Sequence, residues 1–330
     1  MDQKKIMEIL MKAFKHLIIF LISASLYSEQ IQREDFKEEC KGDCENGKAT
    51  LTAKDKDGKV VFKYEGSFKQ KKFHGKGIIT YENLNSFTYE GDFDSNNFHG
   101  KGKIKFQNGN TFEGAFENNL LNGAGILTMK NGDRIEGDFF GEISRWSGSG
   151  TFSSVSKKDR YTGSFKEGKF HGFGFYFYPD NSKYIGFFNS GKPEGPGYYI
   201  SDNKQYIGIF ENLNTLNIGY YFVKGKYFDY LEIKDGKQTK KYFISPSLGQ
   251  YISEKNDFRN IGIKADETGN VFFGELEDDL PEGQGQFITS EGHCYYGNFK
   301  NGKFDGEGIL YNKDGKVIYS GNWKNGKLDK

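Results

Sequence analysis

Residues 161–183 read YTGSFKEGKFHGFGFYFYPDNSK, and this stretch decides the fold. Tyr161, Gly163 and Phe165 alternate with polar residues on a first strand. A turn at Glu167-Gly168 leads into a second strand, where glycines alternate with aromatic residues. Because alternate side chains of a strand lie on one face, large rings share a face with bare glycines. A glycine weakens a strand unless a neighbouring ring needs its space, so we predict that the rings of each hairpin lie over the glycines of the next.

The motif recurs with a nearly fixed period from Tyr64 almost to the last residue. Its first-strand glycines are Gly66, Gly91, Gly114, Gly137, Gly163, Gly186, Gly208, Gly274, Gly297 and Gly321. A Gly-x-Gly pair begins nine residues after most of them, and we expect a side chain added at Gly172 in one such pair to overpack the ring layer. A period this short is typical of hairpins stacked in one direction, and short Asn-Gly and Asp-Gly turns make the strands antiparallel.

Three copies carry a specific resemblance: YEGSFKQKKFHGKG at 64–77, YEGDFDSNNFHGKG at 89–102 and YTGSFKEGKFHGFG at 161–174. They resemble the MORN (membrane occupation and recognition nexus) repeat, which has an aromatic residue two before a glycine, Phe or Trp two after it, and then Gly-x-Gly. The resemblance covers about four-fifths of the chain, although Ile135 replaces one leading aromatic and residues 209–270 largely lack the glycines. We expect an all-β fold: an elongated, single-layer antiparallel meander of stacked β-hairpins, twisted and trough-shaped.

The composition supports a β-repeat protein. The 330 residues include 44 glycines and 17% aromatic residues but only five prolines, which does not fit a disordered chain. The negative mean hydropathy argues against a protein with several membrane spans. The formal net charge is +1, so there is no electrostatic reason to expect nucleic acid or anionic lipid as a partner.

Residues 1–28 have the pattern of a secretory signal peptide. Lysines precede an apolar run at 17–22 that is too short to cross a bilayer, and small residues follow, with cleavage after Ser25 or Ser28. A buried helix, or a start at Met7 or Met11, is the alternative. We expect an exported protein in the bacterial periplasm, on the cell surface or secreted. The absence of any N-x-S/T sequon favours the bacterial setting.

The rest of the chain divides by its repeat pattern. Residues 29–61 are expected to form a tether and an N-terminal half-repeat cap, 62–208 the MORN array, 209–270 degenerate repeats or a joint, and 271–330 the C-terminal MORN repeats. Within the cap, Cys40 and Cys44 stand close enough in sequence for a disulfide in an exported chain. Two free thiols are the alternative, while a metal site would need more ligands nearby.

Two sets of aligned polar residues have side chains of the kind used in catalytic or metal sites. Three histidines share one position before the Gly-x-Gly pair, but equivalent residues of adjacent hairpins are about 10 Å apart, too far to share an ion. A carboxylate row is better explained as a solvated stripe, since Thr162, Ile185 and Ile207 take its place later. These sets are His74, His99 and His171, and Glu65, Glu90, Glu113 and Glu136. No catalytic motif occurs in its required context, so we predict no enzyme, no metal and no cofactor.

The resemblance to MORN proteins implies a non-catalytic interaction scaffold. It would present an extended aromatic and glycine-rich β-surface to a protein partner, or to a second copy of itself, in the cell envelope or extracellular space. The alternative is a binding module for envelope glycan or phospholipid headgroups; no nucleic acid is expected. The rings expected to form the surface are Tyr64, Phe68, Tyr89, Phe93, Phe112, Phe116, Tyr161, Phe165, Tyr184 and Phe188.

Overall fold

The structure, a computed structural model, describes residues 36–329 except 83–85, 202–204, 213–214, 224–226, 235–236, 245–249, 252–260, 267, 269 and 279. Side chains of 205–206, 211–263 and 265 are also not described. The predicted signal peptide and the start of the tether lie outside the described residues. Within the described part, every regular element is a strand, and no helix could span a membrane.

The strands form two sheets. The first sheet contains β1 (Lys37–Gly42), β2 (Lys48–Lys54), β3 (Val60–Lys69), β4 (Lys72–Tyr81), β5 (Phe87–Asp94), β6 (Asn97–Phe106), β7 (Thr111–Glu117), β8 (Leu120–Thr128), β9 (Arg134–Gly141), β10 (Ser147–Ser153), β11 (Arg160–Lys166), β12 (Lys169–Phe177), β13 (Lys183–Asn189), β14 (Lys192–Ile200), β15 (Gln205–Asn212), β16 (Thr215–Val223), β17 (Tyr227–Lys234) and β18 (Lys237–Ile244). The second contains β19 (Gln250–Tyr251), β20 (Ile261–Ala265), β21 (Val271–Glu277), β22 (Leu280–Ile288), β23 (Cys294–Lys300), β24 (Lys303–Tyr311), β25 (Val317–Lys324) and β26 (Lys327–Leu328).

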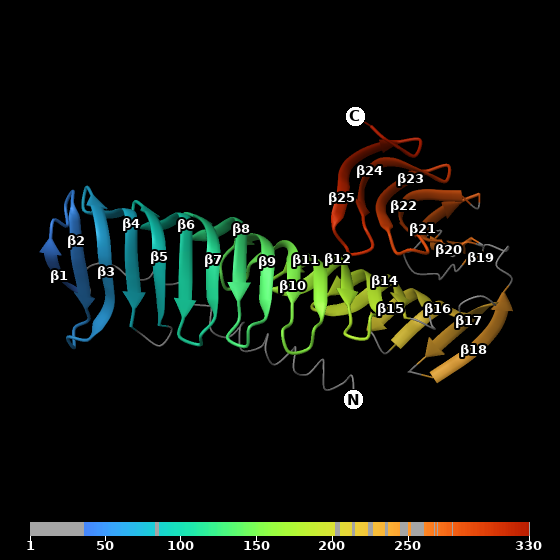
Figure 1. The fold of residues 1–330 in the computed structure, drawn as a ribbon, viewed down its shortest axis with the longest axis horizontal. Coiled ribbons are helices and arrows are strands. Elements are labelled where there is room, and N and C mark those ends of the chain that lie inside the picture. Colours follow the sequence, from blue (N-terminus) through green and yellow to red (C-terminus); the bar gives the residue numbers. More distant parts are fainter. Residues whose placement is uncertain are drawn as a thin grey trace. The chain divides into compact units, whose positions relative to one another are not determined.

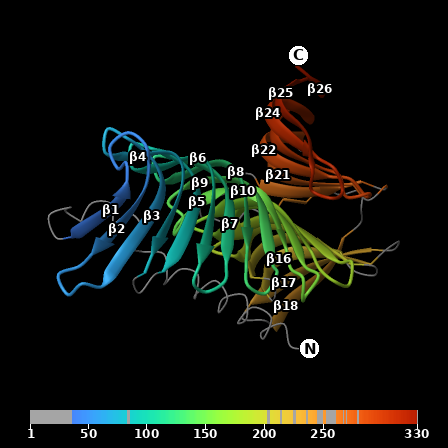
Figure 2. The same ribbon diagram turned by 60° about the vertical axis from the view of Figure 1, so that its left-hand side comes forward.

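The described residues fold as two compact units. Unit 1 holds residues up to 160 together with 164–170, and unit 2 holds 161–163 together with 171–330. In unit 1, each strand from β1 to β10 pairs antiparallel with its neighbours in the chain, and Figures 1 and 2 show them side by side in a twisted, open sheet. The predicted antiparallel meander of hairpins is confirmed.

Rings cover glycines, as predicted, but within one hairpin. A Cβ added at Gly66 or at its cross-strand partner Gly77 would collide with the Tyr64 ring of the same hairpin. The Tyr64 ring also stacks on Phe73 of that hairpin, with ring centroids 3.9 Å apart. The next hairpin contributes only an edge contact, from Phe93 at 5.1 Å. The expectation that rings lie over the next hairpin's glycines is therefore wrong, because a two-residue step along the strand already brings a ring over its own glycine.

The hydroxyl of the covering tyrosine has a partner of its own. Tyr64 Oη donates to the carbonyl oxygen of Ser67 at 2.9 Å, and Tyr89 Oη donates to that of Asp92 at 2.7 Å. Burial raises the pKa of Tyr64 to about 12, so the phenol keeps the proton that it donates. A tyrosine at this position thus fills the space above the glycines with its ring and donates a hydrogen bond to a backbone carbonyl with its hydroxyl.

The two glycines of each Gly-x-Gly pair have different causes. The first adopts the left-handed backbone region, with φ of +66° at Gly75, +59° at Gly100 and +62° at Gly172, and the strand register shifts beside it in the β3–β4 and β5–β6 pairs. A Cβ at Gly75 would meet only Ser67, at 3.8 Å. The reason given for Gly172 is therefore corrected: a side chain at this position strains the backbone, whereas the second glycine of the pair is the one beneath the ring.

Hydrogen bonds from turn residues connect hairpins to the ones before them. Asn96 Oδ1 accepts a hydrogen bond from the backbone N–H of Phe73 at 2.8 Å, and the Asn96 N–H donates to the Phe73 carbonyl at 3.1 Å. Asn119 repeats both contacts with Phe98 one hairpin later. Both asparagines have positive φ, which Asn tolerates better than most residues. These contacts bind equivalent turns together and help to keep the period constant.

We expect Asn96→Leu to lower the free energy of unfolding of unit 1 by about 1–2 kcal/mol. It removes the acceptor for a partly buried N–H and places a branched side chain at positive φ. Urea denaturation followed by circular dichroism would measure the change. The exposed Lys72→Leu is the control and should change stability by less than about 0.5 kcal/mol. Equal effects of the two substitutions would contradict the turn-locking role.

In unit 2 two sheets pack face to face. The face of β12–β15 that points away from the covering rings is apolar, and it meets the second sheet in a core in which Phe173 stacks on Tyr296, with centroids 4.9 Å apart and planes 8° apart. The fully buried members of this core are Phe173, Phe175, Ile185, Tyr198, Ile207, Val271, Phe273, Ile288 and Cys294. Each sheet is single-layered, but their packing against one another is not foreseen by the repeat pattern. Burial raises the pKa of the Cys294 thiol, so it behaves as an inert core residue.

The glycine-poor stretch continues the hairpins and then changes sheet. Strands β15 to β18 pair in order, and Gly208 still lies opposite Gly219. On the other side of β16, Gly219 lies opposite Leu231 of β17 and not opposite another glycine. The first sheet ends at Ile244 and the second begins at Gln250. The interval predicted as degenerate repeats or a joint thus contains both paired hairpin strands and the break between sheets.

Candidate functional site

The ten rings expected to form a binding surface are all buried, with exposed fractions of 5% or less. The leading ring of each hairpin covers the glycines of that hairpin, and the Phe two positions after the glycine packs edge-on against leading rings, as Phe116 meets Tyr89 of the neighbouring hairpin at 5.2 Å. The rings therefore hide one another and need no partner to cover them. The expectation of an exposed aromatic surface is corrected: these residues form the hydrophobic core of the stack.

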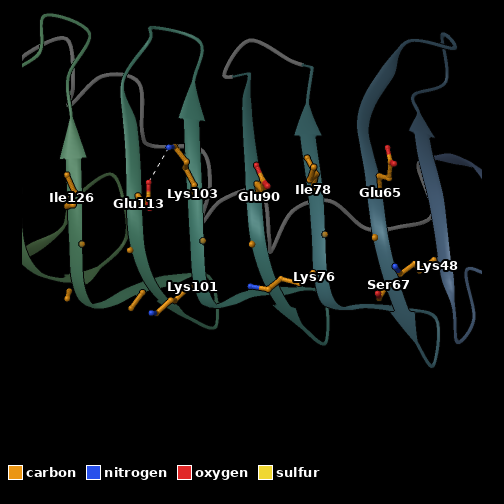
Figure 3. A pocket seen from close by; sticks show the side chains of 18 of the residues that line it. Lys48, Glu65, Ser67, Lys76, Ile78, Glu90, Lys101, Lys103, Glu113 and Ile126 are labelled. Atoms are coloured by element: carbon orange, nitrogen blue, oxygen red, sulfur yellow. Dashed lines mark ion pairs between the residues drawn. The ribbon is translucent and has the colours of Figure 1, made fainter.

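A groove lies on the opposite face of unit 1. It extends across the strands from β2 to β9 and has a volume of about 1510 Å³ (Figure 3). Most of its side chains stand immediately before or after the paired glycines of both strands, because these positions alternate with the ring-bearing ones. The peptide groups at the glycines lie between them. The repeat that decides the fold therefore also positions the groove, because the side chains of the groove alternate along each strand with the rings.

Two rows of charged side chains line the groove. The glutamate row consists of Glu65, Glu90, Glu113 and Glu136, and the lysine row consists of Lys48, Lys76 and Lys101. Cross-strand register aligns the glutamates on every second strand: Glu65 lies opposite Ile78, which lies opposite Glu90 in the next hairpin, and Lys103 stands between Glu90 and Glu113. Figure 3 shows the two rows as separate lines of side chains at different heights along the strands. The four glutamates are exposed, but the solvated stripe expected from the sequence lies inside a groove.

The charges in the groove nearly cancel. Its lining has five lysines and five carboxylates, and Lys103 Nζ pairs with Glu113 Oε2 at 3.2 Å. Just below the glutamates, Lys76 Nζ lies 2.8 Å from Asp92 Oδ1. Among the described residues, Glu65 and Glu90 form no ion pair, and neither do Lys48 and Lys101. Both rows therefore offer uncommitted charges to a ligand.

The described residues contain no group of three or more His, Cys, Asp or Glu side chains that could hold a metal ion. His74 Nδ1 instead lies 3.2 Å from Asp94 Oδ1 in the neighbouring hairpin. The groove carboxylates are distributed along the sheet rather than gathered around one point. The chemistry that this arrangement offers is charge recognition at regular intervals along a line.

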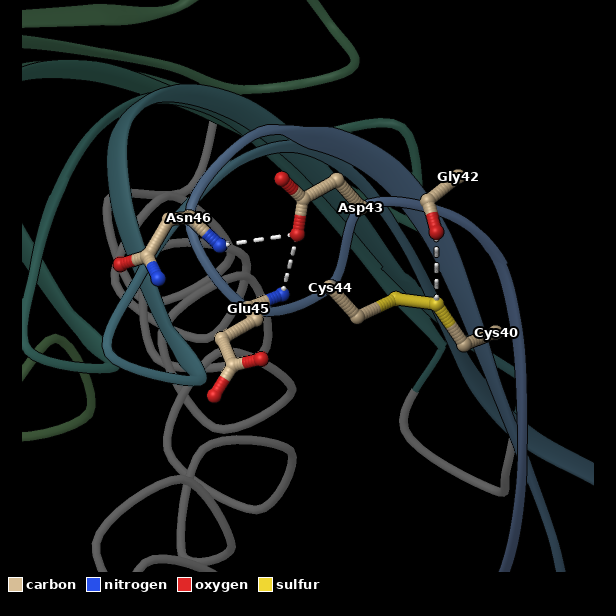
Figure 4. The surroundings of a disulfide bond; sticks show 6 residues. All are labelled: Cys40, Gly42, Asp43, Cys44, Glu45 and Asn46. Atoms are coloured by element: carbon tan, nitrogen blue, oxygen red, sulfur yellow. Dashed lines mark hydrogen bonds between the residues drawn. A yellow bond between two sulfur atoms is a disulfide. The ribbon is translucent and has the colours of Figure 1, made fainter.

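The N-terminal end of the array carries the predicted disulfide. Cys40 and Cys44 are joined across the turn from β1 to β2 (Figure 4). Inside this turn Asp43 Oδ1 accepts hydrogen bonds from the N–H groups of Asn46 and Glu45, at 3.0 and 2.9 Å, and they lower the pKa of its carboxyl. The covalent link and the carboxylate fix the turn beside the first full hairpin.

Comparison with known proteins supports the repeat assignment. The family model for the MORN repeat matches residues 64–86, 89–111, 112–134, 161–183, 184–205, 272–294, 295–317 and 319–329, together more than half of the chain. It leaves out residues 135–160, where Ile135 replaces the leading aromatic residue, and the glycine-poor hairpins. No curated protein matches the chain. MORN repeats are commonly interaction modules and generally not enzymes. By its repeats and its fold, the chain belongs to the MORN-repeat family.

Proposed function

We propose that the protein is a non-catalytic scaffold that holds an extended segment of a protein partner along the groove of unit 1. The groove carries this proposal. Its volume exceeds the roughly 300–1,000 Å³ of a typical small-molecule pocket, and it crosses strands from β2 to β9. A long, shallow site with charges in rows suits a linear ligand better than a compact one.

A polypeptide suits this groove better than the other two candidate ligands. Glycan binding through stacked rings would need exposed aromatic side chains, and the ten candidate rings are buried. Anionic headgroups would need a net positive surface, and the five lysines of the groove are matched by five carboxylates. A polypeptide can carry both signs of charge and match both rows.

The setting that we propose is the cell envelope or the outside of the cell. Its support is the apolar run after the N-terminal lysines and the cysteine pair at the start of the array, since disulfides persist in oxidising compartments. In that setting a stack of hairpins linked by hydrogen-bonded turns would serve as a rigid support for its partner.

Photo-crosslinking tests the proposal directly. A photoreactive amino acid in place of Ile78, which is 42% exposed between Glu65 and Glu90, should capture a defined protein in the native envelope. The same group in place of Val155, which is 65% exposed outside the groove lining, should not. Glu90→Lys should abolish the capture, and the purified partner should bind the wild-type chain directly. Equal capture at both positions, or capture unaffected by Glu90→Lys, would rule the groove out.

A further inference from the structure

We infer that the segment held in the groove is a polyproline II helix with a three-residue charge period, its basic side chains on the glutamate row and its acidic ones on the lysine row. This inference rests on the proposed function and specifies the partner's conformation and charge pattern. Three observations lead to it: the spacing of the rows, their opposite charge, and what occupies the same face in unit 2.

The spacing of the rows selects the ligand's conformation. Successive glutamates of the row are two strands apart, as the pairing of Glu65 with Ile78 and of Ile78 with Glu90 shows. At about 4.8 Å between strands the row repeats about every 9.6 Å. A polyproline II helix has three residues per turn and a rise of about 3.1 Å, so its side chains repeat about every 9.3 Å. Over the three intervals from Glu65 to Glu136 the mismatch is only about 1 Å by the same figures.

Other regular backbones fit this spacing less well. In a β-strand, side chains on one side recur about every 6.7 Å, which falls out of step with the row after one hairpin. In an α-helix, seven residues, or nearly two turns, rise about 10.5 Å, and the error over three intervals grows to roughly 3 Å. A helix also needs a channel about 10 Å wide, whereas the two rows stand only two residues apart along each strand.

The opposite charge of the rows fixes the side-chain pattern. With three residues per turn, a polyproline II chain in the groove directs one residue of each triplet to the glycine floor and one to each row. Lysine or arginine fits beside Glu65 and Glu90, and glutamate or aspartate fits beside Lys48 and Lys101. Among the described residues, none of these four row members forms an ion pair. Proline or another small residue fits the floor. The ligand is therefore a segment with a triplet of small, basic and acidic residues.

In unit 2, the sheet face that is equivalent to the groove face of unit 1 is covered by the second sheet. At the position of the row glutamates it has Ile185 and Ile207, and both are packed against the second sheet. A buried, unpaired carboxylate at such a position would carry a large desolvation cost. The charged rows of unit 1 thus exclude an apolar sheet as their occupant and favour a solvated, charged chain.

Fluorescence anisotropy with synthetic peptides tests the inference on the full exported chain. The probe is a labelled peptide of about 15 residues that repeats Pro-Lys-Glu, long enough to span four hairpins. Its control is a peptide of the same composition in shuffled order. We expect the periodic peptide to bind at least about tenfold more tightly, and its binding to weaken as salt rises from about 50 to 500 mM.

Variants separate this inference from the proposed function. Glu65→Lys with Glu90→Lys should weaken periodic-peptide binding about tenfold or more, while Asp57→Lys, in an exposed turn outside the groove lining, should leave it unchanged. Equal binding of the periodic and shuffled peptides, or tighter binding of a helical peptide with charges every seven residues, would overturn the polyproline II inference. Crosslinking through Ile78 would still stand in that case. Failure of crosslinking with retained peptide binding would instead remove the proposed partner function alone.

Discussion

Gly102→Val is expected to lower the free energy of unfolding of unit 1 by about 3 kcal/mol, and the Tyr89 ring is the cause. A Cβ at Gly102 would sit inside the van der Waals envelope of that ring, with its three nearest atoms all in the Tyr89 side chain. The ring cannot retreat, because it is fully buried and stacks on Phe98 with centroids 3.9 Å apart. Urea denaturation followed by circular dichroism would measure the loss.

A double-mutant cycle identifies the ring as the source of the strain. Tyr89→Ala alone should cost about 3–5 kcal/mol, as for other large buried aromatic residues. Combined with Gly102→Val it should cost clearly less than the sum, since valine then fills part of the space that the ring vacates. Strictly additive losses would show that the ring and the glycine do not share that space, and the packing principle of the whole stack would fail.

Ile185→Glu should separate the two sheets of unit 2, with a loss of about 3–5 kcal/mol for an unpaired charge placed in that core. Ile185 has an exposed fraction of 0% and packs with the buried residues of both sheets. Hydrogen exchange would show the loss: amides of β21–β24 should lose protection while those of β2–β9 keep theirs.

The chain supplies the matched control for this substitution. Position 90 of unit 1 is equivalent in the repeat and already carries glutamate, so the hairpin backbone accepts that residue. Glu90→Ile exchanges the same two residues in the opposite direction on an exposed site and should change stability by less than about 0.5 kcal/mol. If Ile185→Glu were equally mild, the two sheets of unit 2 would not share a core.

Much of the architecture follows from the sequence because the interactions that build it are local. Tyr64, Gly66 and Gly77 lie within 14 residues of one another, and their alternation predicts a hairpin and a ring over bare glycine. The same locality predicts the Cys40–Cys44 disulfide. The error about which glycines lie under the ring arose because period alone does not distinguish a contact within a hairpin from one between hairpins.

One change in the repeat coincides with the groove and with the second core. The change from Glu65, Glu90, Glu113 and Glu136 to Ile185 and Ile207 is visible in the chain, and it marks where one face passes from solvent to a core. By itself the change is equally compatible with a solvated stripe, so it predicts neither the groove nor the second core. The prediction of exposed rings assumes that a single sheet exposes both of its faces, but Tyr89 and its neighbours bury one another.

The sequence by itself determined the repeat: its period, its antiparallel hairpins and the position of each ring and glycine along its strand, since these depend on residues close in the chain. Only the tertiary structure decided which face is open and which is covered. That depends on contacts such as Phe173 with Tyr296, more than 100 residues apart, and on how far neighbouring rings shield one another. A pattern with a period near 23 residues contains no information about such distant pairings, and the candidate groove exists because unit 1 carries charge where unit 2 carries isoleucine.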